Sequence, residues 1–173
     1  MKKTRILVFL GLLVAMDIIL THLLAFYPLP SVRLSFGFVP VSFSPIFFGP
    51  IIGGIGAMLG DIIGTVLFPT GGPYFVGFTL SALVTGVIYG LFLHKRAKSV
   101  LNILLAVLCI TIFVDLGMNT YWLSIILGKG FLLLLPARIV KSLVMVPVQV
   151  AVIYAMWRYA GAFIEKNYIN EKN

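Results

Sequence analysis

Long apolar runs alternate with short polar stretches along this chain, and the runs define its architecture. A helix that crosses a membrane needs about 20 mostly apolar residues to match a hydrocarbon core about 30 Å thick. Six runs meet or approach this length, at residues 6–26, 36–49, 51–68, 76–93, 100–123 and 132–159. We predict a helix for each run and no strands, because a helix satisfies its own backbone hydrogen bonds in lipid. The second run is short, and we expect Pro40 and Pro45 to break it.

The composition agrees with this pattern and excludes a soluble protein. Hydrophobic residues make up 61% of the 173 residues and charged residues 10%, whereas a soluble domain averages about 25% charged residues. The sequence therefore predicts an all-α integral membrane protein, with residues 1–173 forming one six-helix bundle and a single domain. The first residues are similar to a signal peptide. Because they lack a clear cleavage site, we expect them to remain as the first helix.

Residue types that build metal, cofactor or catalytic sites are scarce. Cys109 is the single cysteine, which excludes an internal disulfide and a site built on several thiolates. His22 and His94 lie far apart, without the spacing of metal ligands. The chain contains neither a GxxxxGK[ST] phosphate-binding loop nor a Ser/His/Asp arrangement. We therefore predict no enzyme activity and no cofactor, and expect partner subunits to supply any energy from ATP.

Positive charges form three clusters, and these predict the orientation in the membrane. The clusters precede the first helix, separate the fourth helix from the fifth, and follow the sixth: Lys2, Lys3 and Arg5; His94, Lys95, Arg96 and Lys98; Arg158, Lys166 and Lys172. Six crossings place all three on one side, which the positive-inside rule assigns to the cytoplasm together with both termini. Topology thus explains most of the net charge of +8 without a nucleic-acid partner. Loops 27–35, 69–75 and 124–131 then face outward, and the first carries Arg33, whose charge topology does not require.

Ionisable side chains inside the predicted helices are candidates for function, because burying a charge in a membrane is costly. These residues are Asp17, Asp61, Asp115, Arg138 and Lys141. Asp115, Asn119 and Trp122 share a helix face by their spacing of four and seven. Arg138, Lys141 and Ser142 share a face of the next helix at similar depth. We predict a polar pocket between these faces, open to the outside beneath the 27–35 and 69–75 loops. In the alternative, Asp115 simply neutralises Arg138 or Lys141.

The composition of the outer half favours a flat, anionic small molecule. The outward cations Arg33, Lys129, Arg138 and Lys141 exceed the outward anions Asp61 and Asp115. Aromatic residues accompany them and could stack on a planar ligand or form an interfacial belt: Phe36, Phe38, Tyr74, Phe75, Tyr121 and Trp122. Short, proline-interrupted helices mark binding sites in transporters, although the second helix could also be a kinked packing helix.

Small residues recur at four-residue spacing on two helices. Gly56, Gly60 and Gly64 form such a face on the third helix, and we expect it to pack within the bundle. Gly11 and Ala15 form a shorter one on the first helix, where the face could serve a partner protein.

The chain resembles the substrate-binding membrane subunits, or S components, of energy-coupling factor (ECF) vitamin transporters, and among them the folate-specific subunits. The stretches that carry this resemblance are RLSFGFVP (33–40), FPTGGPYFVGFTLS (68–81), NTYWLS (119–124) and PARIVKSLVMVPVQ (136–149). The similarity follows nearly the whole chain in order. One departure is in the first helix, where Gly11 and Ala15 replace the alanine-xxx-alanine pattern with which the family docks its coupling subunit.

The resemblance implies an importer subunit in a prokaryotic cell membrane. It would bind folate tightly from outside and topple in the membrane to release it inward. A transmembrane coupling subunit and two ATPase subunits would drive this cycle. The implied ligand-binding residues are Arg33, Phe36, Thr70, Gly71, Gly72, Tyr74, Asn119, Trp122, Arg138 and Lys141, and the implied docking residues are Gly11 and Ala15.

Individual roles follow from the same resemblance. Arg33 would complement the ligand's charge from a lid loop, and residues 70–74 would form the second part of the lid. Asn119 and Arg138 would hydrogen-bond the pterin or its linker, supported by Lys141, which could also meet the ligand itself. Trp122 and Phe36 would stack on its rings.

Three other functions stay open at this stage. An S component for thiamine is disfavoured, because thiamine is a cation and the spare outward cations would repel it. An S component for riboflavin is disfavoured as well, because neutral riboflavin would leave these cations without anionic partners on the ligand. A membrane enzyme acting on lipid head groups would need an acidic metal cluster, and the three aspartates lie on different helices. A purely structural subunit leaves the polar residues of the predicted pocket unexplained.

Overall fold

The computed structural model describes residues 3–29, 32–69 and 74–161 of the chain. Helical segments alternate with short connections, and one small hairpin follows the first helix. In order, the elements are α1 (Lys3–Ile18), η1 (Ile19–Leu23), β1 (Phe26–Leu29), β2 (Val32–Leu34), α2 (Phe38–Phe48), α3 (Pro50–Leu67), α4 (Val76–Leu93), α5 (Val100–Cys109), η2 (Ile110–Asn119), α6 (Thr120–Leu127), α7 (Phe131–Met156) and η3 (Trp157–Gly161). The η segments are π-helices, whose turns are wider than those of an α-helix.

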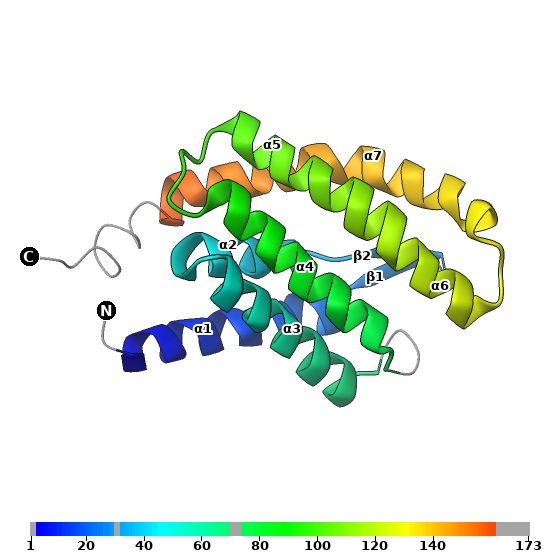
Figure 1. The fold of residues 1–173 in the computed structure, drawn as a ribbon, viewed down its shortest axis with the longest axis horizontal. Helices are drawn as coiled ribbons and strands as arrows, with labels where there is room; N and C mark the ends of the chain where they lie inside the picture. The colour runs from blue at the N-terminus through cyan, green and yellow to red at the C-terminus, as the bar shows by residue number, and fades with distance from the viewer. Residues whose placement is uncertain (1–2, 30–31, 70–73, 162–173) are drawn as a thin grey trace, which may run out of the picture.

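The helices form an elongated bundle (Figure 1). α5, η2 and α6 run on as one long helix beside α7, and α3 packs along α4. The start of α1, the α4–α5 connection and η3 lie at one end of the long axis. The α6–α7 turn lies at the other end, and α3 ends along the lower edge of the bundle between the two ends. The described members of the three predicted basic clusters therefore lie in segments at the same end of the bundle, while Lys2, Lys166 and Lys172 lie outside the described residues.

Five helical segments are long and apolar enough to cross a membrane, among the described residues: Ile6–Leu23, Pro50–Leu67, Val76–Leu93, Val100–Leu127 and Phe131–Tyr159. The bounds of α4 agree with the prediction of 76–93. The fifth predicted helix is longer than expected, because it continues through residues 124–127, which had been assigned to a loop. The outer connection to α7 is correspondingly reduced to residues 128–130.

Two expectations about the segment after the first helix were wrong. First, the described chain does contain strands: β1 and β2 pair antiparallel, with Phe26 opposite Leu34. The two strands pair with each other, so the hairpin forms some of its own backbone hydrogen bonds where the chain leaves the helix bundle. Second, Pro40 and Pro45 do not break α2, which remains one helix of 11 residues. Pro40 lies in its first turn, where the missing N–H has no helical partner to lose.

Close packing of small residues holds α3 against both of its neighbours. A Cβ added to Gly86 of α4 would lie 2.7 Å from the Cα of Gly54. On another face of α3, a Cβ at Gly56 would lie 2.8 Å from Leu10, and one at Gly60 would lie 2.5 Å from the Asp17 carboxylate. The predicted internal packing of the glycine face on the third helix is therefore confirmed. The preceding turn depends on Gly49, whose φ of 92° is readily adopted only by glycine.

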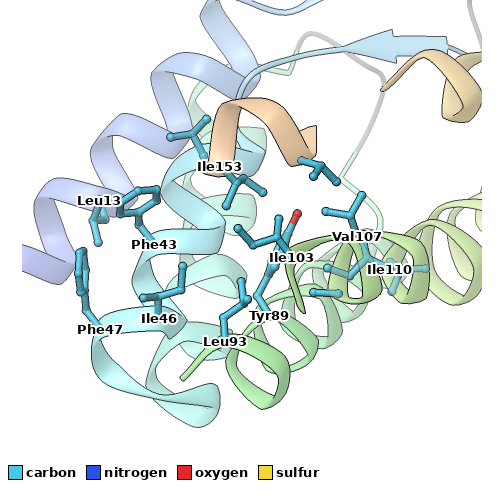
Figure 2. Packing of buried hydrophobic residues seen from close by; sticks show 14 residues of the cluster. Leu13, Phe43, Ile46, Phe47, Tyr89, Leu93, Ile103, Val107, Ile110 and Ile153 are labelled. Atoms are coloured by element: carbon cyan, nitrogen blue, oxygen red, sulfur yellow. The ribbon is translucent and has the colours of Figure 1, made fainter. Parts of the chain in front are cut away.

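A hydrophobic cluster fills the bundle near the α4–α5 connection (Figure 2). Side chains from α1, α2, α4, α5 and α7 meet there, including Phe43, Leu93, Ile103 and Ile153. The last three have almost no exposed surface. Tyr89 lies at the border of this cluster and also lines the cavity described below. The core therefore closes one end of the cavity.

Candidate functional site

A cavity of about 370 Å³ lies within the bundle, enclosed mainly by α1, η1, α3, α4, η2 and α7. Its size falls in the range of small-molecule sites, which span about 300–1,000 Å³. The ionisable and other strongly polar residues in its lining are Asp17, Thr21, His22, Ser35, Asp61, Thr65, Ser81, Thr85, Tyr89, Asp115, Asn119, Arg138, Lys141 and Gln149. Apolar side chains such as Phe38, Phe75 and Phe78 complete the lining.

The wall formed by η2 and α7 brings together residues predicted from two separate helices. Arg138 is 8% exposed, and its Nη2 donates a hydrogen bond of 3.1 Å to the main-chain carbonyl of Asp115. The Asp115 carboxylate instead accepts a hydrogen bond of 3.2 Å from the Asn119 amide. Asp115 thus hydrogen-bonds Arg138 through its carbonyl, and its carboxylate acts on the guanidinium by charge without a hydrogen bond to it.

Two polar atoms in this wall are buried and lack a hydrogen-bond partner among the described residues. They are Nε of Arg138, a donor, and Oδ1 of Asn119, an acceptor. Unsatisfied buried groups are uncommon in folded proteins because each costs about 1–3 kcal/mol. Both residues line the cavity. The wall therefore offers a donor and an acceptor to a bound molecule.

The opposite wall, formed by α1 and α3, is acidic. Asp17 is buried and accepts a hydrogen bond of 2.8 Å from Thr21, one turn further along. Asp61 accepts a hydrogen bond of 2.8 Å from Thr79 of α4. The Thr79 hydroxyl also lies 3.0 Å from the hydroxyl of Tyr74. We expected structural roles for Asp17 and Asp61, and both have structural contacts, but both also line the cavity.

This arrangement changes the predicted charge of the pocket. Three carboxylates line the cavity, from Asp17, Asp61 and Asp115, together with two cations, Arg138 and Lys141. The cations therefore do not outnumber the acids in the described lining. The predicted excess of cations depended on counting Arg33 and Lys129 of the outer loops as part of the pocket. The lining instead suits a ligand that carries hydrogen-bond donors as well as acceptors or negative charge.

Three of the predicted binding residues line the cavity: Asn119, Arg138 and Lys141. Trp122 does not. Its Nε1 donates a hydrogen bond of 3.1 Å to Ser81, and its ring lies 5.7 Å from that of Phe75. Ser81 and Phe75 do line the cavity, so Trp122 supports the wall from behind. The spacing of Asp115, Asn119 and Trp122 predicted one shared face, but the π-helical turn of η2 places the third residue elsewhere.

The predicted lid residues are placed only in part. Phe36 and Tyr74 are 52% and 43% exposed, and neither lines the cavity. Phe36 lies just before α2, with its ring 6.0 Å from that of Phe38, which does line the cavity. Thr70, Gly71 and Gly72 lie outside the described residues, as does the side chain of Arg33.

Several lining residues were missed by the sequence reasoning, among them Thr21, Thr65, Ser81, Thr85 and Gln149. Single hydroxyl and amide groups in apolar helices give little signal, because they can also bond to their own helix. Thr85 shows this, since its hydroxyl donates to the Ser81 carbonyl one turn earlier. In the described part of the chain, no three His, Cys, Asp or Glu residues are grouped so that they could hold a metal ion.

The predicted docking residues lie on a different surface. Gly11 and Ala15 are exposed on α1, and a Cβ added to Gly11 would meet no atom within 4 Å. Large apolar neighbours on α1, including Leu7, Val8 and Leu12, are exposed as well. In a membrane this face would meet lipid or another protein.

Membrane-length apolar helices around a ligand-sized polar cavity define the class: a helical membrane protein with an internal binding site. The model of the family described as "ECF transporter, substrate-specific component" matches residues 5–157. The chain therefore belongs to the substrate-specific components of ECF transporters, a family of transport subunits and not of enzymes.

Individual relatives agree with this assignment. The chain is 42% identical over 158 residues to "Folate transporter FolT" of Clostridium novyi (strain NT), covering 91% of each chain. It is 32% identical to "Folate transporter FolT" of Leuconostoc mesenteroides, covering 87% of this chain and 83% of the relative. A solved structure described as "Crystal structure of FolT bound with folic acid" matches with a TM-score of 0.82 and 32% identity, covering 90% of this chain and 93% of the other.

Proposed function

We propose that this protein binds folate in the cavity and is the folate-specific substrate-binding subunit of an ECF-type importer. The observation that carries the proposal is the paired wall of Arg138 and Asn119, two cavity-lining residues with an unpartnered donor and acceptor. Similarity to two folate transporters and to a FolT structure with folic acid supports folate as the ligand.

The chemistry of folate fits the lining. Its pterin is flat and carries both donors and acceptors, and its glutamate carries two carboxylates. Arg138 and Asn119 would hydrogen-bond the pterin or its linker, since charged donors form the stronger hydrogen bonds. Lys141 would support Arg138 or meet the ligand. The acids Asp17 and Asp61 would face the donors of the pterin. Phe75 and Phe78 supply apolar surface for its rings.

The outer segments would close the site. Arg33 stays our prediction for the first part of the lid, and Thr70, Gly71, Gly72 and Tyr74 for the second part. Phe36 would stack on the ligand. In the described part of this lid, Tyr74 lies 3.0 Å from Thr79, which donates to Asp61 in the cavity. This chain of contacts would link the position of the second lid segment to the acidic wall.

The proposed topology has six crossings in the plasma membrane of a prokaryote, with both termini in the cytoplasm. α2, about 16 Å long from its 11 residues at about 1.5 Å each, would provide the sixth crossing together with the hairpin. Gly11 and Ala15 would dock the transmembrane coupling subunit, and two ATPase subunits would drive toppling. The exposed, apolar face of α1 supports this assignment.

Fluorescence of a single tryptophan tests the proposal. Trp157 packs against Phe43 and Phe47 and beneath the Lys98 amine, at the core end of the bundle. In a Trp157→Phe variant, Trp122 would report on the nearby cavity alone. We expect saturable quenching by folic acid and none by thiamine or riboflavin. A folded sample that responds to riboflavin or thiamine, and not to folic acid, would replace the folate assignment with the alternative vitamin.

A further inference from the structure

The anchor of Arg138 is a main-chain carbonyl that accepts two side-chain donors. Besides Nη2 of Arg138 at 3.1 Å, the Asp115 carbonyl accepts a hydrogen bond of 3.0 Å from the Thr120 hydroxyl. Thr120 has no exposed surface, and it does not line the cavity. The Thr120 hydroxyl therefore contacts the site through the Asp115 carbonyl.

This contact lies where the long helix changes from π to α geometry. η2 ends at Asn119 and α6 begins at Thr120. The Thr120 N–H donates to the Gly117 carbonyl, and the Thr120 hydroxyl donates to the Asp115 carbonyl. At such junctions the regular ladder of backbone hydrogen bonds is interrupted, and carbonyl groups become open to side chains.

A carbonyl anchor has a consequence that a carboxylate anchor would not have. The carbonyl is neutral, so it orients the guanidinium without cancelling its charge. Meanwhile the Asp115 carboxylate holds the Asn119 amide at 3.2 Å. Arg138 is thus held by a neutral acceptor, with Nε unpartnered beside the cavity.

We propose that Thr120 is a positioning residue for ligand binding, which fixes the Asp115 carbonyl and through it the guanidinium of Arg138. The proposal rests on the proposed function, in which Arg138 contacts folate. It predicts that affinity depends on the Thr120 hydroxyl, although no atom of Thr120 would touch the ligand.

Three substitutions separate the hydroxyl from the packing of Thr120. Thr120→Ser keeps the hydroxyl and loses the methyl group, Thr120→Val does the reverse, and Thr120→Ala differs from the serine variant only by the hydroxyl. Thr111→Val is the matched control, because Thr111 on η2 is buried like Thr120 and does not line the cavity. The full-length purified proteins are titrated with folic acid by calorimetry.

We expect the valine and alanine variants to bind folic acid about tenfold more weakly, the equivalent of about 1.4 kcal/mol. The serine variant and the Thr111 control should stay within about twofold of the wild type, below the energy of one hydrogen bond. The alanine and serine pair preserves the comparison even if the valine variant does not fold.

The opposite order, with the valine variant like the wild type and the serine variant weak, would show a packing role and overturn the proposal. Equal binding by the serine and alanine variants would overturn it too. A wild type that does not bind folic acid would remove the proposed function and this inference with it. A binding wild type with the opposite order of variants would remove only the role of Thr120.

Discussion

Replacing Arg138 with methionine removes the guanidinium while keeping an unbranched, apolar side chain of similar reach. Arg138 is 8% exposed, and its Nη2 donates a hydrogen bond of 3.1 Å to the Asp115 carbonyl, with Nε left for the ligand. A hydrogen bond from a charged group contributes about 1.5–3 kcal/mol. Because about 1.4 kcal/mol corresponds to a factor of ten, we expect Arg138→Met to weaken folic acid binding by about 10- to 150-fold.

Isothermal titration calorimetry of the detergent-purified protein measures this change. Arg158→Met is the matched control, because Arg158 is an exposed residue of η3 and does not line the cavity. The control should bind folic acid like the wild type. Arg138→Met binding within twofold of the wild type would show that the guanidinium does not contact the ligand, and the proposed site would have to be abandoned.

Four further substitutions test the packing, the docking face and the role of Trp122. Gly86→Ala should lower the melting temperature, since its Cβ would lie 2.7 Å from the Cα of Gly54 and overpacking costs about 1–3 kcal/mol, whereas Gly11→Ala should leave it unchanged. An unchanged Gly86→Ala protein would contradict this packing. Gly11→Leu should prevent co-purification with the coupling subunit while folic acid affinity stays the same; normal assembly would move the docking face elsewhere. Trp122→Phe loses the hydrogen bond to Ser81 and part of the ring that packs beside Phe75. It should weaken binding by up to about tenfold, or about 0.5–1.5 kcal/mol, and a larger loss by titration would favour direct contact.

The helices were predictable wherever apolar runs end at strong polar signals. α4 was predicted with the bounds that the structure shows, because a proline-glycine turn precedes it and the His94–Lys98 cluster follows it. The end of the long fifth helix was misjudged, since residues 123–127 are mostly apolar and its terminal signal is Gly128. That residue has a φ of 61° and ends α6 in the left-handed conformation.

The π-helical turn of η2 could not be predicted from the pattern. In a run with few polar residues, a wider turn leaves little trace in the spacing of hydrophobic residues. Asp115 and Asn119 are hydrogen-bonded in the π-helical geometry, whereas Trp122 donates its hydrogen bond to Ser81 of α4. Of the three residues predicted to share one pocket face, Asp115 and Asn119 therefore line the cavity and Trp122 does not.

The cavity's acidic wall shows a second limit of sequence reasoning. Asp17 and Asp61 were recognised as unusual, because charges inside membrane helices need a reason. Their position could not be derived, since it depends on the glycine face of α3, where Gly60 lets the Asp17 side chain approach. Contacts between non-adjacent helices decided which polar residues share one cavity.

A structure of this protein determined with folic acid tests the central claim most directly. We predict one folic acid molecule in the cavity between α1, α3, α4, η2 and α7, with polar atoms within hydrogen-bond distance of Arg138 and Asn119. Folic acid bound outside this cavity, or inside it but beyond the reach of both side chains, would contradict the account.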